Sequence, residues 1–513
     1  MPQANQRTSL IPYHLRSFLG GMSDYEDKGI AGAFKAGYGL DIRKQKDSLT
    51  CQFALKDDLA VGTMTAPAYF VVPASDGNTY FFCHDGKIFR RKSNGSYSLQ
   101  GYGIIPVYTD TQEAGQIIGA CEWYDNAGFT YLLWATPTRL NIKKIAGTGY
   151  TQTEPWNDVN TASTGSWPKT NLTSTDWHSM VIANGALQIT NGNVMALVGY
   201  DLSYTNQSLK LIPGVTARCV LERGKYAVIG CNRTDGKDEC ALFSWDGIGL
   251  SWNDKELIKF GGIKSMIDTE MALAQIGTGG QLYISDFNTP IPFRQIRGGG
   301  QSDPDGITSY HGMALIGIYN NTNDIHGVLG NGIYSVGRVN KNAPIVVNLE
   351  YQLTCDEIYS VKVIGSDIIC VYRLNGQYGV KIVDTGTYAN AVYQSLDLVA
   401  PLGTRRYPIP LGRLLSWART DLQCTPLLPG CKIEVWYKVD KATKGGANND
   451  GWIQANMEPG NTGGGLQFQG TDNQNAVFYI GQKARVLETM IKLFPSGNRS
   501  PEVNEINNYF TVG

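Results

Sequence analysis

The chain has 513 residues, and its 44 Lys and Arg almost balance its 45 Asp and Glu. Only 17% of the residues are charged, so no global basic field is available to attract nucleic acid and no acidic tail is present. The 60 Gly and 28 Tyr are typical of a turn-rich β protein. We therefore expect an all-β protein without specific nucleic-acid binding.

The first 21 residues lack the basic start, apolar core and small-residue cleavage site of a secretory signal. No apolar stretch reaches the roughly 20 residues that a membrane span needs. We expect a soluble protein, made in a cytosol and without a membrane span. Its ten cysteines are then expected to be reduced, and mostly buried, thiols. The sequence leaves open a bond between Cys424 and Cys431.

Residues 1–66 are polar and glycine-rich. We expect a short helix near residues 13–19, and the small residues of 29–39 predict an extended arm or a loop. An extended run over 40–55 follows. An N-terminal strand of this kind commonly pairs with the last blade of a propeller and removes its open edge.

Residues 67–395 repeat one unit, in which two β-rich runs flank Asp-Gly, Asn-Gly or Gly-Asn. These pairs supply the positive φ of a tight hairpin. Recurrence every 40–50 residues or so indicates a radial array of sheets. We predict a β-propeller of six or seven blades, with seven preferred; a pair of large β-sandwiches is the competing interpretation. The clearest units are 80–91, 186–200, 241–252, 328–339 and 361–383. The expected blade starts are Tyr69, Ile117, Met180, Ala217, Ile263, Met313 and Tyr359.

One interval is lengthened by an insertion over residues 148–176, rich in Ser, Thr and Asn. Insertions of this type form loops on one face of a repeat array. Trp156 and Trp167 lie in it, and Trp177 follows it directly. Such rings can stack on sugars or anchor a protein interface, so we predict an interaction loop. The alternative is that the rings pack back onto the propeller.

Residues 396–513 differ in character. A proline-rich connector, 401–410, precedes strands separated by long polar loops. Alternating apolar and polar residues in 431–439 (CKIEVWYKV) are typical of a sandwich strand. We predict a separate C-terminal β-sandwich.

No catalytic signature occurs in the chain. The five histidines are isolated and form no zinc-ligand spacing, and neither a nucleophile elbow nor a phosphate-binding loop is present. The Asp-Gly pairs are explained by hairpin geometry, and the repeated Asp-box turn of sialidase-like propellers is missing, as are WD40 signatures. We expect a non-enzymatic protein with no cofactor and no metal.

The two ends of the chain carry a resemblance. Residues 18–59, with the strand-like Leu40-Asp41-Ile42-Arg43, resemble the start of tailed-bacteriophage virion proteins. Residues 433–438, 478–494 and 500–509, with Trp452, are similar to the small β-sandwich that ends some phage tail proteins.

The resemblance implies a structural subunit of the viral tail, in its nozzle, hub or tip. Such a subunit forms a homo-oligomeric ring with copies of itself, contacts other virion tail proteins, and serves host attachment or genome delivery. It implies no catalytic residue. Two alternatives stay open: a receptor-binding adhesin that recognises a host surface glycan through the 148–176 loop and, less favoured, a propeller glycosidase.

Overall fold

Over the residues that it describes, the computed structural model is built almost wholly of strands and turns, with a short 3-10 helix, η1 (Gln112–Gly115). Two compact units are present. The ring unit comprises Lys56–Gly337 and Leu353–Val383, and the terminal unit comprises Met1–Leu55, Arg338–Gln352 and Asp384–Gly513. The predicted domain ranges 1–66, 67–395 and 396–513 stay a prediction. The structure describes residues 10–23, 32–42, 47–100, 103–162, 164–173, 176–237, 239–258, 262–269, 273–277, 280–285, 291–325, 327–338, 345–399, 414–446, 450–457, 465–469 and 474–512.

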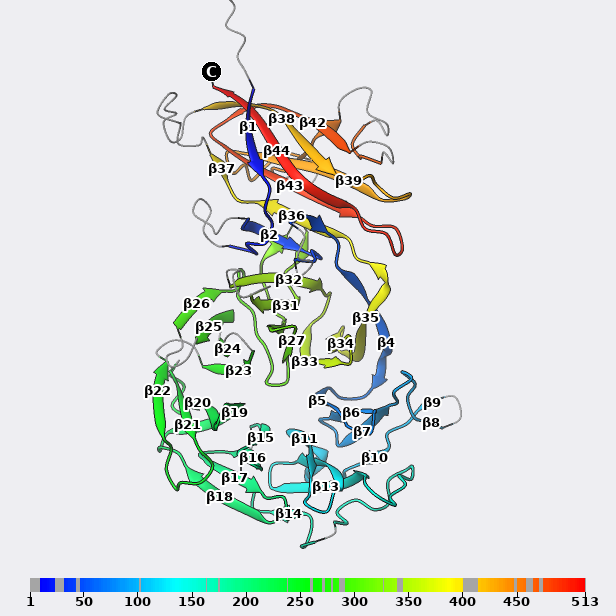
Figure 1. Ribbon diagram of the computed structural model, residues 1–513, viewed down its shortest axis with the longest axis vertical. Coiled ribbons are helices and arrows are strands. Elements are labelled where there is room, and N and C mark those ends of the chain that lie inside the picture. Colours follow the sequence, from blue (N-terminus) through cyan, green and yellow to red (C-terminus); the bar gives the residue numbers. More distant parts are fainter. Residues whose placement is uncertain are drawn as a thin grey trace, which may run out of the picture. The chain divides into compact units, whose positions relative to one another are not determined.

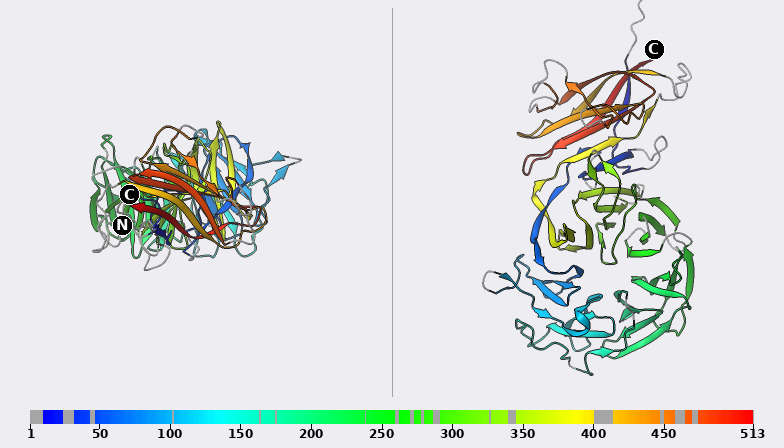
Figure 2. Two further views of the ribbon diagram at one scale, coloured as in Figure 1. Left: turned by 90° about the horizontal axis from the view of Figure 1, so that it is seen from above. Right: turned by 180° about the vertical axis from the view of Figure 1, so that it is seen from behind.

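Seven four-stranded sheets occur in the described chain. In Figure 1 they follow one another around a ring, which Figure 2 shows again from behind. Their strand orders are β10-β7-β6-β5, β11-β12-β13-β14, β15-β16-β17-β18, β19-β20-β21-β22, β23-β24-β25-β26, β27-β28-β31-β32 and β33-β34-β35-β4.

The strands of these sheets, in chain order, are β4 (Phe53–Met64), β5 (Ala68–Pro73), β6 (Thr79–Cys83), β7 (Lys87–Arg91), β10 (Tyr108–Thr109), β11 (Gly119–Tyr124), β12 (Thr130–Ala135), β13 (Arg139–Ala146), β14 (Lys169–Thr170), β15 (Met180–Ala183), β16 (Ala186–Asn191), β17 (Val194–Val198), β18 (Tyr204–Lys210), β19 (Val215–Arg223), β20 (Tyr226–Arg233), β21 (Cys240–Trp245), β22 (Asp254–Ile258), β23 (Ile263–Asp268), β24 (Leu273–Gly277), β25 (Gln281–Ser285), β26 (Ile291–Gln295), β27 (Ile307–Tyr310), β28 (Met313–Ile318), β31 (Gly332–Gly337), β32 (Val346–Gln352), β33 (Glu357–Ile364), β34 (Asp367–Leu374) and β35 (Gln377–Tyr388). Two minor hairpins are formed by β8 (Leu99–Gln100) with β9 (Gly103–Ile104) and by β29 (Asp324–Ile325) with β30 (Val328–Leu329).

One strand of each sheet lies innermost in the ring unit: β5, β11, β15, β19, β23, β27 and β33. Successive innermost strands contact one another, and β33 contacts β5. Each innermost strand pairs in antiparallel fashion with the strand that follows it in the chain. The starts of β5 and β33 lie together, because the Tyr69 ring packs against the Tyr359 ring. This is an all-β fold of the β-propeller type.

Turn chemistry explains most of the hairpins. Asn375 and Gly376 have φ values of 51° and 75° between β34 and β35, the pair of positive angles that a type I′ turn requires. The predicted hairpin over 328–339 is wrong, because β30 pairs with β29 and β31 with β28. There the side chain of Asn331 accepts from the backbone N–H of Asn321 and donates to the carbonyl of Cys355 instead of closing a tight turn. Met313 likewise begins the second strand of its sheet, not the first.

Two six-stranded antiparallel sheets form the terminal unit. One has the order β1-β44-β38-β42-β41, with β3 also paired to β44; the other has the order β2-β36-β43-β39-β40, with β37 also paired to β43. Their strands are β1 (Ile11–Leu15), β2 (Phe34–Tyr38), β3 (Leu49–Thr50), β36 (Ala391–Ser395), β37 (Leu398–Val399), β38 (Leu415–Cys424), β39 (Lys432–Val439), β40 (Ile453–Gln454), β41 (Asn456–Met457), β42 (Asn475–Ala484), β43 (Val486–Phe494) and β44 (Glu502–Val512).

The N-terminal segment contributes strands to both of these sheets. The predicted helix near residues 13–19 is wrong: β1 is a strand, with Ile11 opposite Phe510 of β44. The predicted arm over 29–39 is wrong where described, because β2 is largely buried and pairs with β36. A Cβ on Gly37 would lie 2.6 Å from the carbonyl oxygen of Val392, so glycine is what lets these two backbones approach.

The run expected over 40–55 divides between two partners. Leu49–Thr50 (β3) pairs with β44, whereas β4 (Phe53–Met64) is the outer strand beside β35. All ten cysteines are free thiols, and both Cys424 and Cys431 are buried. Within the described chain, no helix has the length and apolarity to cross a bilayer.

Candidate functional site

The three predicted tryptophans do not form one exposed surface. Trp156 is 5% exposed and packs in a core cluster with Tyr80 and Trp134, with ring centroids 5.7 and 6.4 Å away. Trp167 is half-buried against a neighbouring cluster. Trp177 is half-buried and packs against the cluster that holds Trp156. Residues 163, 174 and 175 of this region lie outside the described residues, and an interaction role for the loop stays a prediction.

Trp177 belongs instead to a cluster at the starts of the innermost strands. Four of these strands carry a β-bulge near their first residues, between Ala68 and Phe70, Ala217 and Cys219, Ile263 and Ser265, and Ile358 and Ser360. A bulge adds one unpaired residue and redirects its side chain, and bulges are frequent beside functional sites. The bulged residues are Tyr69, Arg218, Lys264 and Tyr359.

The bulged residues and the side chains around them form a group that we name the strand-start cluster. Its aromatic contacts centre on Tyr69. The Tyr69 ring packs edge-on against Trp177 at 4.8 Å and against Tyr359 at 5.4 Å. The guanidinium of Arg218 lies 5.0 Å from the Trp177 ring and donates to Asp176 at 2.9 Å. The full cluster consists of Tyr69, Trp177, Arg218, Lys264, Asp303, Tyr319, Glu357 and Tyr359.

Two carboxyl groups lie in the strand-start cluster. Burial raises the pKa of Asp303 to about 6, although nearby Arg218 lowers it, and the Tyr319 hydroxyl donates to this carboxyl at 3.3 Å. Glu357 accepts from Arg373 at 3.0 Å and from the Tyr359 hydroxyl. Both carboxyl groups of the cluster therefore accept a hydrogen bond from a tyrosine hydroxyl.

Asp305 holds the elements beneath this cluster together. Its Oδ2 accepts from the backbone N–H of Val71 at 3.0 Å and from the Ser360 hydroxyl at 2.6 Å, and its Oδ1 lies 2.6 Å from Nζ of Lys362. Burial raises the pKa of this carboxyl, and the Lys362 ammonium lowers it. One side chain therefore links the segment before β27 to both β5 and β33.

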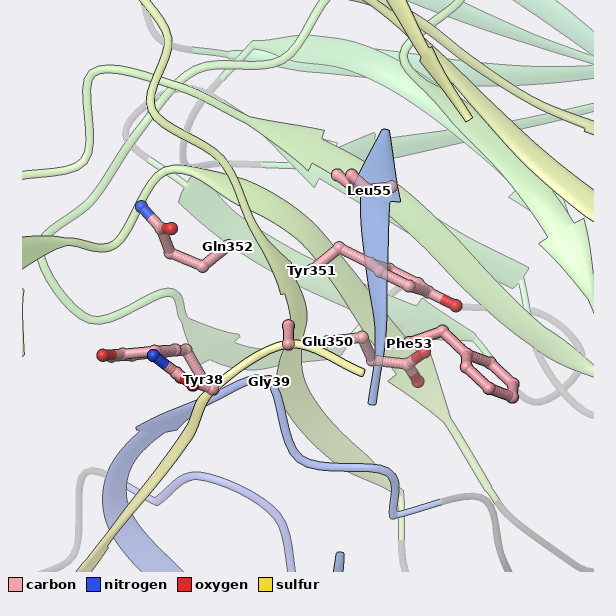
Figure 3. A pocket seen from close by; sticks show the side chains of 9 residues that line it. Tyr38, Gly39, Phe53, Leu55, Glu350, Tyr351 and Gln352 are labelled. Carbon is pink, nitrogen blue, oxygen red and sulfur yellow. The ribbon is translucent and has the colours of Figure 1, made fainter. Parts of the chain in front are cut away.

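A second candidate site is a pocket of about 210 Å³ in the terminal unit (Figure 3). Its wall is built by backbone hydrogen bonds: Gln52 N–H donates to the Gly39 carbonyl at 2.6 Å and Ala389 N–H to the Gln52 carbonyl at 2.9 Å. Gly39 has φ +67°, and a Cβ there would lie 2.5 Å from the Asn390 carbonyl oxygen. Only glycine fits this corner. The lining residues are Tyr38, Gly39, Phe53, Leu55, Glu350, Tyr351, Gln352, Ala389 and Asn390.

Sequence reasoning named only Trp177 of the strand-start cluster as an interaction residue, and it missed the pocket. A bulge is a property of the pairing between two strands, so Tyr69 or Arg218 carries no local signal. The pocket combines residues 38–55, 350–352 and 389–390, which only the tertiary fold brings together. Among the described residues, no group of three His, Cys, Asp or Glu side chains could hold a metal ion; His326 lies outside them.

No family model matches this chain, and no curated protein matches it. Among solved structures it is similar to the WD40 β-propeller domain of Doa1 (TM-score 0.43, 12% identity, covering 65% of this chain and 97% of that one). It is also similar to the WD40 repeats of RRP9 (TM-score 0.45, 10% identity, covering 65% of this chain and 99% of that one). A third similar structure is Raptor from Chaetomium thermophilum (TM-score 0.42, 10% identity, covering 65% of this chain and 29% of that one). Likenesses of this level carry no argument about function.

Proposed function

We propose that this chain is a non-enzymatic structural subunit of a bacteriophage tail, in the nozzle, hub or tip. It would form a ring through contacts with copies of itself and with other tail proteins, and would serve host attachment or genome delivery. The assignment to a tail comes from the sequence resemblance at the two chain ends. The role in protein contact is supported by one hairpin of the ring unit.

That hairpin joins β21 to β22 and presents aliphatic side chains to solvent. Ile248 is 88% exposed, Leu250 is 89% exposed and Leu257, on β22, is 65% exposed. These are the three most exposed large apolar residues among those described. Grouped exposed apolar side chains mark interaction surfaces, because a partner that covers them gains the hydrophobic free energy of their burial.

The hairpin tip is also rigid. Asp246 Oδ1 accepts from the backbone N–H groups of Ile248 at 3.0 Å and Gly249 at 3.2 Å, and Oδ2 accepts from Asn253 at 3.1 Å. The indole of Trp245 donates to the Gly249 carbonyl at 2.8 Å. A preformed loop loses little conformational entropy when it binds. The tip is therefore suited to a protein contact.

The finer architecture belongs to the same proposal. We infer that the seven four-stranded sheets are the blades of a closed seven-bladed propeller, supported by the contact of β33 with β5. We infer that the two six-stranded sheets of the terminal unit pack as a β-sandwich, supported by the alternating burial along β42. Electron cryo-microscopy of the purified chain would count the blades directly.

The decisive experiment measures self-association of the purified full chain. Mass photometry should find a closed oligomer, a multiple of 56.1 kDa, and the pair Ile248→Asp with Leu250→Asp should shift it to monomer. Leu428→Asp, a 48% exposed leucine of the terminal unit, is the matched control and should leave the oligomer intact. Two results together would overturn the proposal: the wild-type chain is a monomer, and gold-labelled antibodies against it do not bind the tails of intact virions.

A receptor-binding role is the second candidate, favoured by the strand-start cluster. Tyr, Trp and Arg are the residues that dominate binding energy at interfaces, and here Tyr69, Trp177 and Arg218 lie together. An adhesin would bind host cells as an isolated protein, and Tyr69→Ala should abolish that binding. Release of sugars from a panel of glycans would instead support a glycosidase that uses Asp303 and Glu357.

A further inference from the structure

The pocket of the terminal unit has a lining of mixed chemistry. Tyr38 and Phe53, both half-buried, contribute aromatic surface, whereas Tyr351 is only 4% exposed; Gln352 and Asn390 contribute amides. In the view of Figure 3, Tyr351 and Phe53 extend to one side of the hollow and Tyr38 and Gln352 to the other. The pocket thus offers apolar faces together with groups that both donate and accept hydrogen bonds.

The size of the pocket limits what can enter. A cavity of about 150 Å³ holds benzene, so about 210 Å³ suits one six-membered ring with small substituents. An unsubstituted aromatic ring would make no hydrogen bonds to the two amides. Hydroxyl groups, which donate and accept, satisfy them.

Charge narrows the ligand further. Glu350, one of the lining residues, is 0% exposed, and its Oε2 accepts from the Gln52 amide at 3.4 Å. The lining contains no Lys, Arg or His side chain that could pair with an anionic ligand. The carboxylate is also the one acidic side chain among the lining residues and is covered from solvent, so it gives a cation no exposed partner.

We propose that this pocket binds one neutral hexopyranose ring, with the aromatic side chains against the C–H faces of the sugar and the amides of Gln352 and Asn390 on its hydroxyls. This inference goes beyond the proposed role in tail assembly and does not depend on it. The sugar could be a free monosaccharide or one residue of a larger glycan, since both present the same ring chemistry.

Saturation-transfer NMR on the full chain tests the proposal with methyl hexosides of glucose, galactose and mannose and with N-acetylglucosamine. At least one of these sugars should receive saturation, with a Kd on the order of 1 mM. Gln352→Ala should weaken the binding of that sugar roughly tenfold, because it leaves a sugar hydroxyl unpaired. Ala389→Trp should abolish binding by filling the pocket without removing any polar group. Leu428→Ala is the control and should bind as the wild type does.

Three results would overturn the inference: no transfer to any neutral sugar at high concentration, transfer that Ala389→Trp leaves unchanged, or transfer only to glucuronic acid, sialic acid or simple amines. Thermal unfolding of each variant shows whether it is folded. Oligosaccharides that carry the same sugar at the end or in the interior distinguish a free ligand from a glycan residue. Oligomer formation is measured separately, so failure of one proposal leaves the other standing.

Discussion

Replacing Asp305 by Ala tests whether one carboxylate joins three segments of the ring unit. The side chain is 12% exposed and supplies both oxygens to donors on other segments. Val71 and Ser360 are buried, so their freed donors would have no access to water. An unsatisfied buried donor costs about 1–3 kcal/mol, whereas Lys362 is partly exposed and can turn to solvent.

We therefore expect Asp305→Ala to lower the free energy of unfolding of the ring unit by about 2–6 kcal/mol, the cost of leaving the two buried donors of Val71 and Ser360 unsatisfied. Asp305→Asn keeps one acceptor and should cost less. Exposed Asp254 is the matched control, and its replacement by Ala should change stability by less than about 0.5 kcal/mol.

Urea unfolding of the full chain, followed by tryptophan fluorescence, measures the change, and hydrogen exchange locates it. Protection of the Val71 amide should fall in the Asp305→Ala protein, because its N–H loses its acceptor. If that variant unfolds within about 1 kcal/mol of the wild type, with Val71 protection unchanged, the three-way link is wrong.

Further predictions concern single residues. The pKa of Asp303 is raised from 3.8 to about 6, so the folded state holds its proton more tightly than the unfolded state. The free energy of unfolding should accordingly fall by about 2 kcal/mol as the pH rises from 4 to 6, and denaturant titrations of Asp303→Asn should lack this slope. Trp156→Ala should lower the unfolding free energy by about 3–5 kcal/mol, because it leaves a cavity in the core. Trp167→Ala should lower it less, because Trp167 is half-buried. Equal decreases in the melting temperature of the two variants would contradict this. Gly39→Ala should lower the free energy of unfolding by about 1–3 kcal/mol, because the position has a positive φ. It should also deform the pocket wall at Asn390, which NMR would detect as changed amide chemical shifts of residues 388–390.

The turns could be predicted from sequence because their chemistry is local. Asn-Gly and Asp-Gly permit positive φ wherever they occur, and Gly86, Gly192 and Gly376 have φ values of 82°, 64° and 75°. The same reasoning failed at residues 328–339, where the turn residues bond to other segments. The expectation of a short helix failed at residues 13–19, where pairing with β44 decided the conformation.

What the sequence determined by itself is an all-β chain of short strands and tight turns, because alternation of apolar residues and turn residues acts over a few positions. The pairing of β1 with β44, of residues almost 500 apart in the chain, leaves no local trace. The bulges that redirect Tyr69 and Arg218, and the pocket walled by Gly39 and Asn390, likewise arise only when distant strands pair. Register and packing are collective properties of the folded chain, and they place the groups on which recognition depends.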